Sequence, residues 1–175
     1  MQKNIILIGF MGAGKTSVGK KLAQKTGLPL LDTDKLIEQQ EKTTVSRIFE
    51  TRGEEAFRKA ETDLLKSLLK KKESVIISAG GGLPLKEENQ TILKKLGLVV
   101  YLKIQPDTVL KRLKGDTTRP LLQGGDVKER VTTLLTRRAP IYQRAAHITI
   151  EADYKTLNQI AEEITTLYTI QGGTK

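Results

Sequence analysis

The stretch "NIILIGFMGAGKTS", residues 4–17, decides the fold, because it runs from a continuously apolar segment through a glycine-rich turn to a lysine. Such an apolar run is typical of a strand that is covered on both faces. The turn matches G-x-x-x-x-G-K-[ST] through Gly9, Gly14, Lys15 and Thr16. The strand, the turn and the helix expected from Lys15 together predict an α/β domain that binds phosphate where its first helix begins.

This turn, the P-loop, has the chemistry that a bound nucleotide requires. Glycines let successive backbone N–H groups curl around phosphate oxygens, and the helix N-terminus adds partial positive charge. We expect Lys15 to reach the β- and γ-phosphates of ATP, and the Thr16 hydroxyl to bind Mg²⁺. The predicted nucleotide-binding residues of the turn are Gly12, Ala13, Gly14, Lys15, Thr16 and Ser17. Motors, switches, transporter subunits and small-molecule kinases all share this motif.

Apolar and amphipathic segments alternate along the rest of the chain, without internal repeats. The strands that we expect are 4–9, 29–32, 74–79, 98–103 and 146–151, and the helices are 15–26, 35–40, 45–50, 54–72, 87–96, 106–113, 127–142 and 154–168. This alternation favours a parallel α/β sheet with right-handed crossovers. Residues 1–175 are predicted to form one domain. Segment 114–126 has no such pattern, and we expect a lid loop there.

Composition excludes several classes of protein. The chain has 175 residues, 38% of them apolar, and no cysteine, so disulfides and thiolate metal sites are excluded. No apolar run approaches the ~20 residues of a membrane span, and no signal peptide is expected. The net charge of +10 suggests an anionic ligand or a lysine-rich solvated surface, and with 4% aromatic residues there are few stacking platforms for nucleic acid. We expect a cytoplasmic monomer that binds neither nucleic acid nor membrane.

The acid that usually binds Mg²⁺ at the end of a nearby strand in P-loop proteins is missing from the third strand. That strand ends in Ser78 and Ala79, whereas Asp32 and Asp34 follow the second. One residue apart in an extended segment, these two carboxylates would point the same way. Asp32 would then hold the metal through water, and Asp34 would orient or deprotonate an attacking hydroxyl. The alternative is that one of them caps the helix expected near Lys35.

Three arginines and three consecutive glycines complete the candidate site. Arg58, Arg119 and Arg138 stand at special positions in a chain otherwise rich in lysine. Two guanidinium groups would suit a carboxylate, and a third on the loop would suit a phosphoryl group in transfer. The alternative for each is a solvated helix face or a structural salt bridge. Gly80–Gly82 predict either unusual backbone angles or close approach of another group, and we favour close approach, with the angles as its means.

Taken together, "GFMGAGKTS", "DTD", "FRKAE", "AGGG", "RPLL" and "RRAPIY" resemble the shikimate kinase family over nearly the whole chain, in its order and approximate spacing. The resemblance implies a five-stranded parallel sheet of order 2-3-1-4-5 between helices. It also implies Mg²⁺-dependent transfer of the γ-phosphoryl group of ATP to the 3-hydroxyl of shikimate, a step in the biosynthesis of chorismate and aromatic amino acids.

The resemblance also assigns roles to individual residues. Asp34 would bind the ring hydroxyls of shikimate, and Arg58 and Arg138 would clamp its carboxylate. Residues 33–61 would form the substrate-binding region. The remaining implied contacts are backbone from Gly80, Gly81 and Gly82, with Gly81 as the expected direct donor; pocket walls from Glu61, Phe49 and Phe57; adenine stacking by Arg112; and ATP phosphates touched by Arg119 in the lid. Segment 151–156 shows no match to the adenine-side contact of the family.

Three other functions stay open at this point. Paired arginines with D-x-D suit a hydroxylated carboxylic acid in general, so a gluconate kinase is one alternative. A nucleotide-dependent switch or binding module is the second, and it would bind ATP without rapid phosphorylation of a small molecule. A nucleic-acid-binding protein that uses the basic charge is the third.

Overall fold

The computed structural model describes residues 4–115 and 124–172, so Arg119 and most of the expected lid lie outside the described residues. The strands are β1 (Asn4–Ile8), β2 (Leu30–Asp32), β3 (Ile76–Ser78), β4 (Gly97–Lys103) and β5 (Ile148–Glu151). The helices are α1 (Lys15–Thr26), α2 (Thr33–Glu41), α3 (Val45–Leu68), α4 (Glu87–Leu96), α5 (Pro106–Arg112), α6 (Val127–Ala145) and α7 (Leu157–Ile170), with a short 3₁₀ turn η1 (Leu83–Leu85).

The five strands form one parallel sheet of order β2-β3-β1-β4-β5, which confirms the expected fold and strand order. β1 lies at the centre and all five of its residues are buried. In its register Ile6 pairs with Ile77 of β3 and with Val99 of β4. A central strand with both neighbours parallel must be covered on both faces, which explains why its sequence is apolar without alternation.

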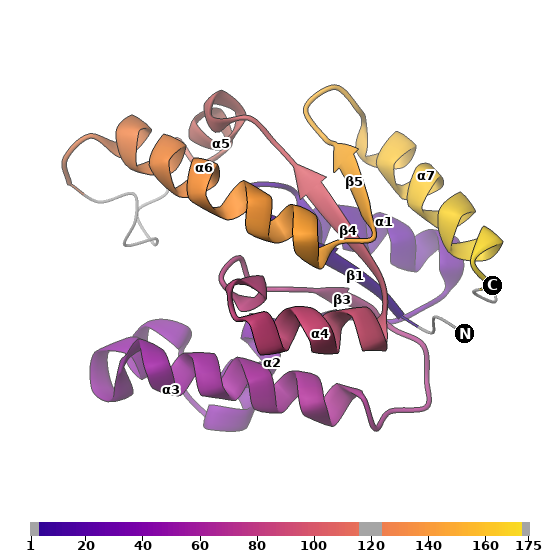
Figure 1. The fold of residues 1–175 in the computed structure, drawn as a ribbon, viewed down its shortest axis with the longest axis horizontal. Helices are drawn as coiled ribbons and strands as arrows, with labels where there is room; N and C mark the ends of the chain where they lie inside the picture. The colour runs from indigo at the N-terminus through magenta and orange to yellow at the C-terminus, as the bar shows by residue number, and fades with distance from the viewer. Residues whose placement is uncertain (1–3, 116–123, 173–175) are drawn as a thin grey trace.

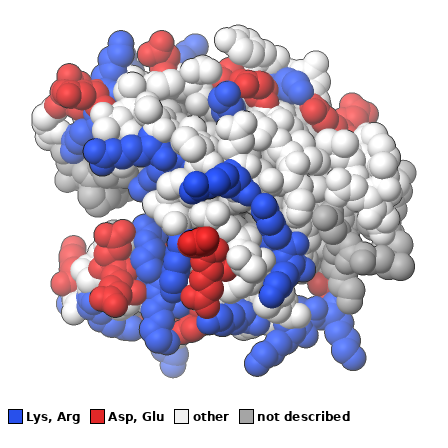
Figure 2. Space-filling model, in the orientation of Figure 1, with Lys and Arg blue, Asp and Glu red and all other residues white. Residues whose placement is uncertain are grey.

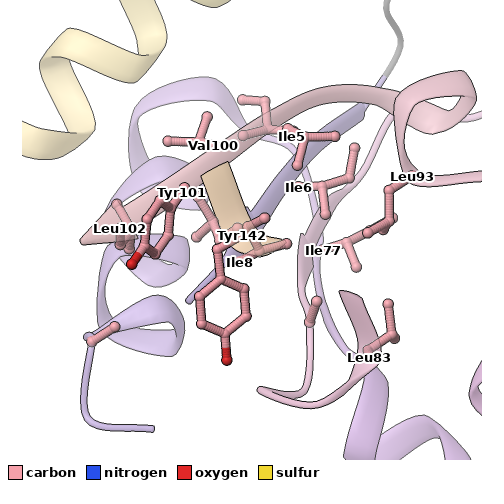
Figure 3. Packing of buried hydrophobic residues seen from close by; sticks show 14 of the residues in the cluster. Ile5, Ile6, Ile8, Ile77, Leu83, Leu93, Val100, Tyr101, Leu102 and Tyr142 are labelled. Carbon is pink, nitrogen blue, oxygen red and sulfur yellow. The ribbon is translucent and has the colours of Figure 1, made fainter. Parts of the chain in front are cut away.

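Helices cover both faces of this sheet (Figure 1). α1 and α7 pack together on one face, and α4 and α6 cover the other, with α3 packed against α2 and α4. Figure 3 shows the core between β1, β3, β4 and the helices, where Ile6 and Ile77 lie near Leu93 of α4 and Tyr142 of α6 lies beside Tyr101. No helix within 4–115 or 124–172 has the length and apolarity that crossing a membrane requires.

The helix boundaries differ from the prediction at several points, and side-chain caps explain two of these differences. α1 and α4 have the predicted bounds. α2 begins two residues earlier than expected, because the Asp32 side chain accepts a hydrogen bond from the Lys35 N–H at 3.1 Å. α3 joins two predicted helices across Gly53, whose φ of 83° marks a kink between them. α6 continues past the predicted end to Ala145, and a Thr156 capping box begins α7 three residues late.

Candidate active site

The carboxyl ends of β1, β2 and β3 surround a cleft of about 270 Å³. In an open α/β sheet this edge is where ligands bind. The lining includes Met11 and most of the P-loop, together with residues that follow β2 and β3: Gly12, Gly14, Lys15, Thr16, Ser17, Asp32, Asp34, Ser78, Ala79, Gly80 and Gly81. The fold therefore brings the predicted phosphate-binding residues and the predicted carboxylates into one cleft.

The P-loop takes backbone angles that favour glycine. Gly9, Gly12 and Gly14 have φ of 150°, 77° and 89°, and Gly14 is the N-cap of α1. Lys15 Nζ donates hydrogen bonds to the carbonyl oxygens of Gly9 at 2.7 Å and Phe10 at 2.9 Å. The ammonium group thus lies against the loop that is expected to bind the phosphates.

Two other members of the predicted phosphate site differ in exposure. The Ala13 side chain is buried in the core, so only its backbone is available to a ligand, whereas Ser17 is exposed. Arg112 approaches the loop from α5, and its Nη1 donates to the Gly12 carbonyl oxygen at 2.8 Å. The arginine assigned to adenine stacking therefore lies directly beside the phosphate-binding loop.

Two hydroxyl oxygens meet at the start of α1, in the cleft that Asp32 also lines. Thr16 Oγ1 is 3.4 Å from Ser78 Oγ, and strand register pairs Ser78 with Asp32. The capping alternative is confirmed for Asp32, whose Oδ1 caps α2. Because Asp32 also lines the cleft, capping does not exclude an outer role toward a metal. Ser78 was missed as a candidate, although its place at the end of the third strand is visible in the sequence.

Asp34 lies in the first turn of α2, so the expectation of an extended segment around it is wrong. The cause is the Asp32 cap, which starts the helix at Thr33. Asp34 Oδ1 is buried and has no hydrogen-bond partner within the described ranges. Burial raises the pKa of Asp34, Asp32 raises it further, and the Lys15 charge opposes both. A buried acceptor without a partner suggests a ligand group there.

The three glycines after β3 allow close approach, but they have no unusual backbone angles. None of Gly80–Gly82 has positive φ, so that part of the prediction is wrong. A Cβ on Gly80 would lie 2.6 Å from Asp34 Oδ1, and one on Gly82 would lie 2.6 Å from Arg58 Cζ. The groups that come close in the structure are therefore the predicted site side chains. Gly81 differs, since its Cβ would have no neighbour nearer than 3.6 Å.

Arg58 is held in place by acids on its own helix. Its Nη1 donates to Glu61 Oε2 at 2.8 Å, and its Nη2 donates to Glu54 at 3.3 Å. Glu61 is fully buried; burial raises its pKa to about 7, and the hydrogen bond from Arg58 opposes that rise. Glu61 therefore positions the guanidinium, which lies 5.5 Å from the Phe57 ring centre. The Phe57 ring packs in turn on that of Phe49, at 5.1 Å between centres.

Arg138 approaches the glycines from the opposite side. It lies on α6, with its Cζ 5.6 Å from the centre of the Phe10 ring. Tyr142, one turn later, donates from its hydroxyl to the Gly81 carbonyl oxygen at 2.6 Å. Burial raises the pKa of Tyr142, while Arg138 and, more weakly, Arg58 lower it. Both arginines of the predicted clamp therefore lie near one loop. Tyr142 was missed, although the spacing of "RRAPIY" places it one helical turn after Arg138.

Basic and acidic side chains are interspersed on the viewed face of the molecule (Figure 2). Figure 2 shows Lys and Arg side chains on several elements of the viewed face, with Asp and Glu between them. Some cations of the described residues are paired, as Lys66 is with Glu88 at 2.6 Å and Lys59 with Asp63 at 2.7 Å. On the face that Figure 2 shows, the mixed charges are those of a solvated surface.

Comparisons with known proteins identify the family of this chain. A sequence model described as shikimate kinase matches residues 11–169. Curated shikimate kinases are 44% identical over 164 residues in Sulfurihydrogenibium sp. (94% of this chain, 96% of the relative) and 40% identical over 166 residues in Caldicellulosiruptor saccharolyticus (95% of each). The structure of the shikimate kinase from Acinetobacter baumannii in complex with shikimate superposes with a TM-score of 0.88 at 38% identity, covering 98% of this chain and 96% of that one.

A more distant likeness concerns the fold alone. The deoxyadenosine kinase from M. mycoides with bound dATP has a TM-score of 0.60 at 18% identity, over 94% of this chain and 98% of that one. The P-loop fold is thus shared widely, whereas the match at about 40% identity over nearly the whole length is specific. The chain belongs to the shikimate kinase family.

Proposed function

We propose that this chain transfers the γ-phosphoryl group of ATP to the 3-hydroxyl of shikimate, giving shikimate 3-phosphate and ADP. The observation that carries the proposal is the single cleft in which a P-loop meets a buried, unpartnered carboxylate oxygen of Asp34. Arg58 and Arg138 flank the adjoining glycine loop. Asp34 thus lies between groups suited to phosphate and groups suited to a carboxylate. This arrangement suits a hydroxylated carboxylic acid as the phosphoryl acceptor.

The oxygen atoms near the start of α1 fit a magnesium ion. Mg²⁺ prefers oxygen ligands and keeps several waters, so it needs few protein ligands. No group of three His, Asp or Glu side chains suited to a metal occurs in the described part of the chain. Thr16 would hold the ion directly and Asp32 through water, beside Ser78. When bound, the ion would neutralise charge on the phosphates of ATP.

The remaining roles follow from where each side chain lies. Lys15 would leave the Gly9 and Phe10 carbonyls for the β- and γ-phosphates, and Arg112 would stack on adenine. Asp34 would accept a hydrogen bond from the attacking hydroxyl and so align it. A loose transition state needs little early deprotonation, so alignment matters more than base strength.

Shikimate itself would lie between the two arginines and the glycine loop. Arg58, fixed by Glu61, and Arg138 would bind its carboxylate. Phe49 and Phe57 would cover its ring, and Gly80–Gly82 would offer backbone. Arg119, in the lid at 114–126, would bring positive charge to the phosphates. The chain would form a single kinase domain, with its substrate-binding region at 33–61. We further propose a cytoplasmic monomer with no nucleic-acid partner, which sedimentation of the purified chain with and without RNA would test.

Release of ADP, measured with and without shikimate, tests the central proposal. We expect shikimate to accelerate ADP formation by orders of magnitude. Gluconate at equal concentration should leave the rate of ADP formation unchanged. Acceleration by gluconate alone would instead identify a gluconate kinase. ATP binding with no acceleration by either acid would favour a nucleotide-dependent switch.

A further inference from the structure

The glycine loop Gly80–Gly82 is held by groups from two helices outside it. Thr33, at the start of α2, accepts a hydrogen bond from the Gly80 N–H at 2.9 Å. Tyr142 of α6 donates to the Gly81 carbonyl oxygen at 2.6 Å. The loop also closes on itself, because the Leu83 N–H donates to the Gly80 carbonyl oxygen at 3.1 Å. These bonds fix the peptide planes on both sides of Gly81.

Fixing a carbonyl also fixes the N–H of the same peptide, because the group is planar and trans and the two point in opposite directions. Tyr142 therefore determines where the Gly82 N–H points, and the turn to Leu83 determines the direction of the Gly81 N–H. Neither of these two N–H groups has a hydrogen-bond partner among the residues that the structure describes. Two preset donors thus remain for a ligand, one on cleft-lining Gly81 and one beside Arg58.

Tyr142 is suited to act as a fixed donor. Its side chain is fully buried, and burial keeps the hydroxyl protonated by raising its pKa. Its ring packs on that of Tyr101 with 5.2 Å between centres, which restrains its position (Figure 3). Arg138 lies one turn before it on α6, so a single rigid helix carries both an arginine of the predicted clamp and the group that orients the glycine loop.

We propose that Tyr142 is a positioning residue for the acceptor substrate: its hydroxyl holds the Gly81 carbonyl so that the Gly82 N–H faces an oxygen of the bound acid, beside the Gly81 N–H that the turn to Leu83 directs. This inference rests on the proposed function, since the acid is shikimate there. Tyr142 itself touches no reacting atom. It acts through the loop, and its contribution is to binding of the acceptor and not of ATP.

The replacement Tyr142→Phe tests this, because it removes one hydroxyl and keeps the buried ring. We expect the KM for shikimate to rise about tenfold, in line with loss of one buried hydrogen bond and of the loop geometry that it fixes. The KM for ATP should stay within twofold. Tyr101→Phe is the matched control, since Tyr101 is equally buried against Tyr142 and makes no hydrogen bond to the loop in the described structure.

Equilibrium binding of shikimate by calorimetry, with the melting temperature of each variant, separates positioning from damage to the fold. A Tyr142→Phe protein that melts like the wild type but binds shikimate about tenfold more weakly supports the proposal. Unchanged affinity for shikimate, equal weakening for ATP, or the same loss in Tyr101→Phe overturns it. A wild-type chain that neither binds nor phosphorylates shikimate defeats the proposed function as well, which distinguishes that failure from the failure of Tyr142 alone.

Discussion

Adding one methyl group at Gly82 should displace Arg58, the arginine proposed to bind the substrate carboxylate, without disturbing the backbone. Gly82 has φ −91° and ψ −11°, angles that alanine adopts freely. A Cβ there would lie 2.6 Å from Arg58 Cζ, about 1 Å closer than carbon atoms in van der Waals contact. The Arg58 side chain is 23% exposed, so its guanidinium has room to move and the loop need not.

The size of the effect follows from that displacement. A misplacement of about 1 Å can cost a positioned group about 100-fold in rate, and a weakened hydrogen bond to a charge costs about 1.5–3 kcal/mol. We therefore expect Gly82→Ala to raise the KM for shikimate roughly 10- to 100-fold and to leave the KM for ATP unchanged. The free energy of unfolding should change by less than about 1 kcal/mol, because Gly→Ala at compatible angles also restricts the unfolded chain.

A double-mutant cycle decides whether the effect passes through Arg58. Initial rates of ADP release, with shikimate varied at saturating ATP, would be measured for Gly82→Ala, Arg58→Ala and the double variant. If the methyl group acts only by moving the guanidinium, the double variant should be no worse than Arg58→Ala. An equal further loss in the Arg58→Ala background would refute this reasoning, and so would an unchanged KM for shikimate in the single variant.

Three further predictions concern buried polar groups. Asp34→Asn should lower kcat by about 100- to 10,000-fold in the ADP-release assay while ATP still binds, because the amide cannot accept in the same way from the attacking hydroxyl; near-normal turnover would contradict the assigned role. Glu61 has a higher pKa folded than unfolded, so its contribution to stability is full below pH 4.5 and is lost as pH rises through about 7, a decrease of about 3 kcal/mol. Urea unfolding at pH 5 and 8 should show that decrease in the free energy of unfolding of the wild type but not of Glu61→Gln. The same change with pH in both proteins would contradict the prediction. Asn89 is fully buried and joins Thr62 Oγ1 at 2.8 Å to the Leu83 carbonyl at 2.9 Å, so Asn89→Ala should cost about 2 kcal/mol or more, against almost nothing for exposed Asn158→Ala; equal costs would mean that this bridge between α3 and η1 is unimportant.

The fold could be predicted from the sequence because its signals are local. Apolar runs mark the buried parallel strands, and the bounds of α1 follow from Gly14 and Gly27, which flank it with positive φ. The strand order could not be predicted in this way, because no local sequence pattern contains it. It came from the family resemblance. The kink in α3 was visible as a break at Gly53, but the continuity of the helix across it was not.

The contacts within the site could be predicted only in part. The residues that would meet were identified by type and motif, but their partners lie far away in the sequence. Tyr142 reaches Gly81 across 61 positions, and no periodicity encodes that contact. The sequence predicts an extended segment around Asp34, because capping by Asp32 reads as an alternative to a ligand role for Asp32, whereas the structure allows both.

The absence of an acid after β3 has a geometric consequence. In the β2–β3 register Asp32 stands level with Ser78, so the carboxylate is displaced sideways by one strand spacing, about 4.8 Å. A direct Mg²⁺–oxygen bond is about 2.1 Å, and one bridging water adds a hydrogen bond of about 2.8 Å. The path from a metal through one bridging water to a carboxylate oxygen is therefore about as long as one strand spacing, which is compatible with the proposed outer role of Asp32 toward a metal bound by Thr16. The end of β3, freed of a bulky acid, continues into Gly80 and Gly82, where the side chains of Asp34 and Arg58 occupy the space that Cβ atoms would need.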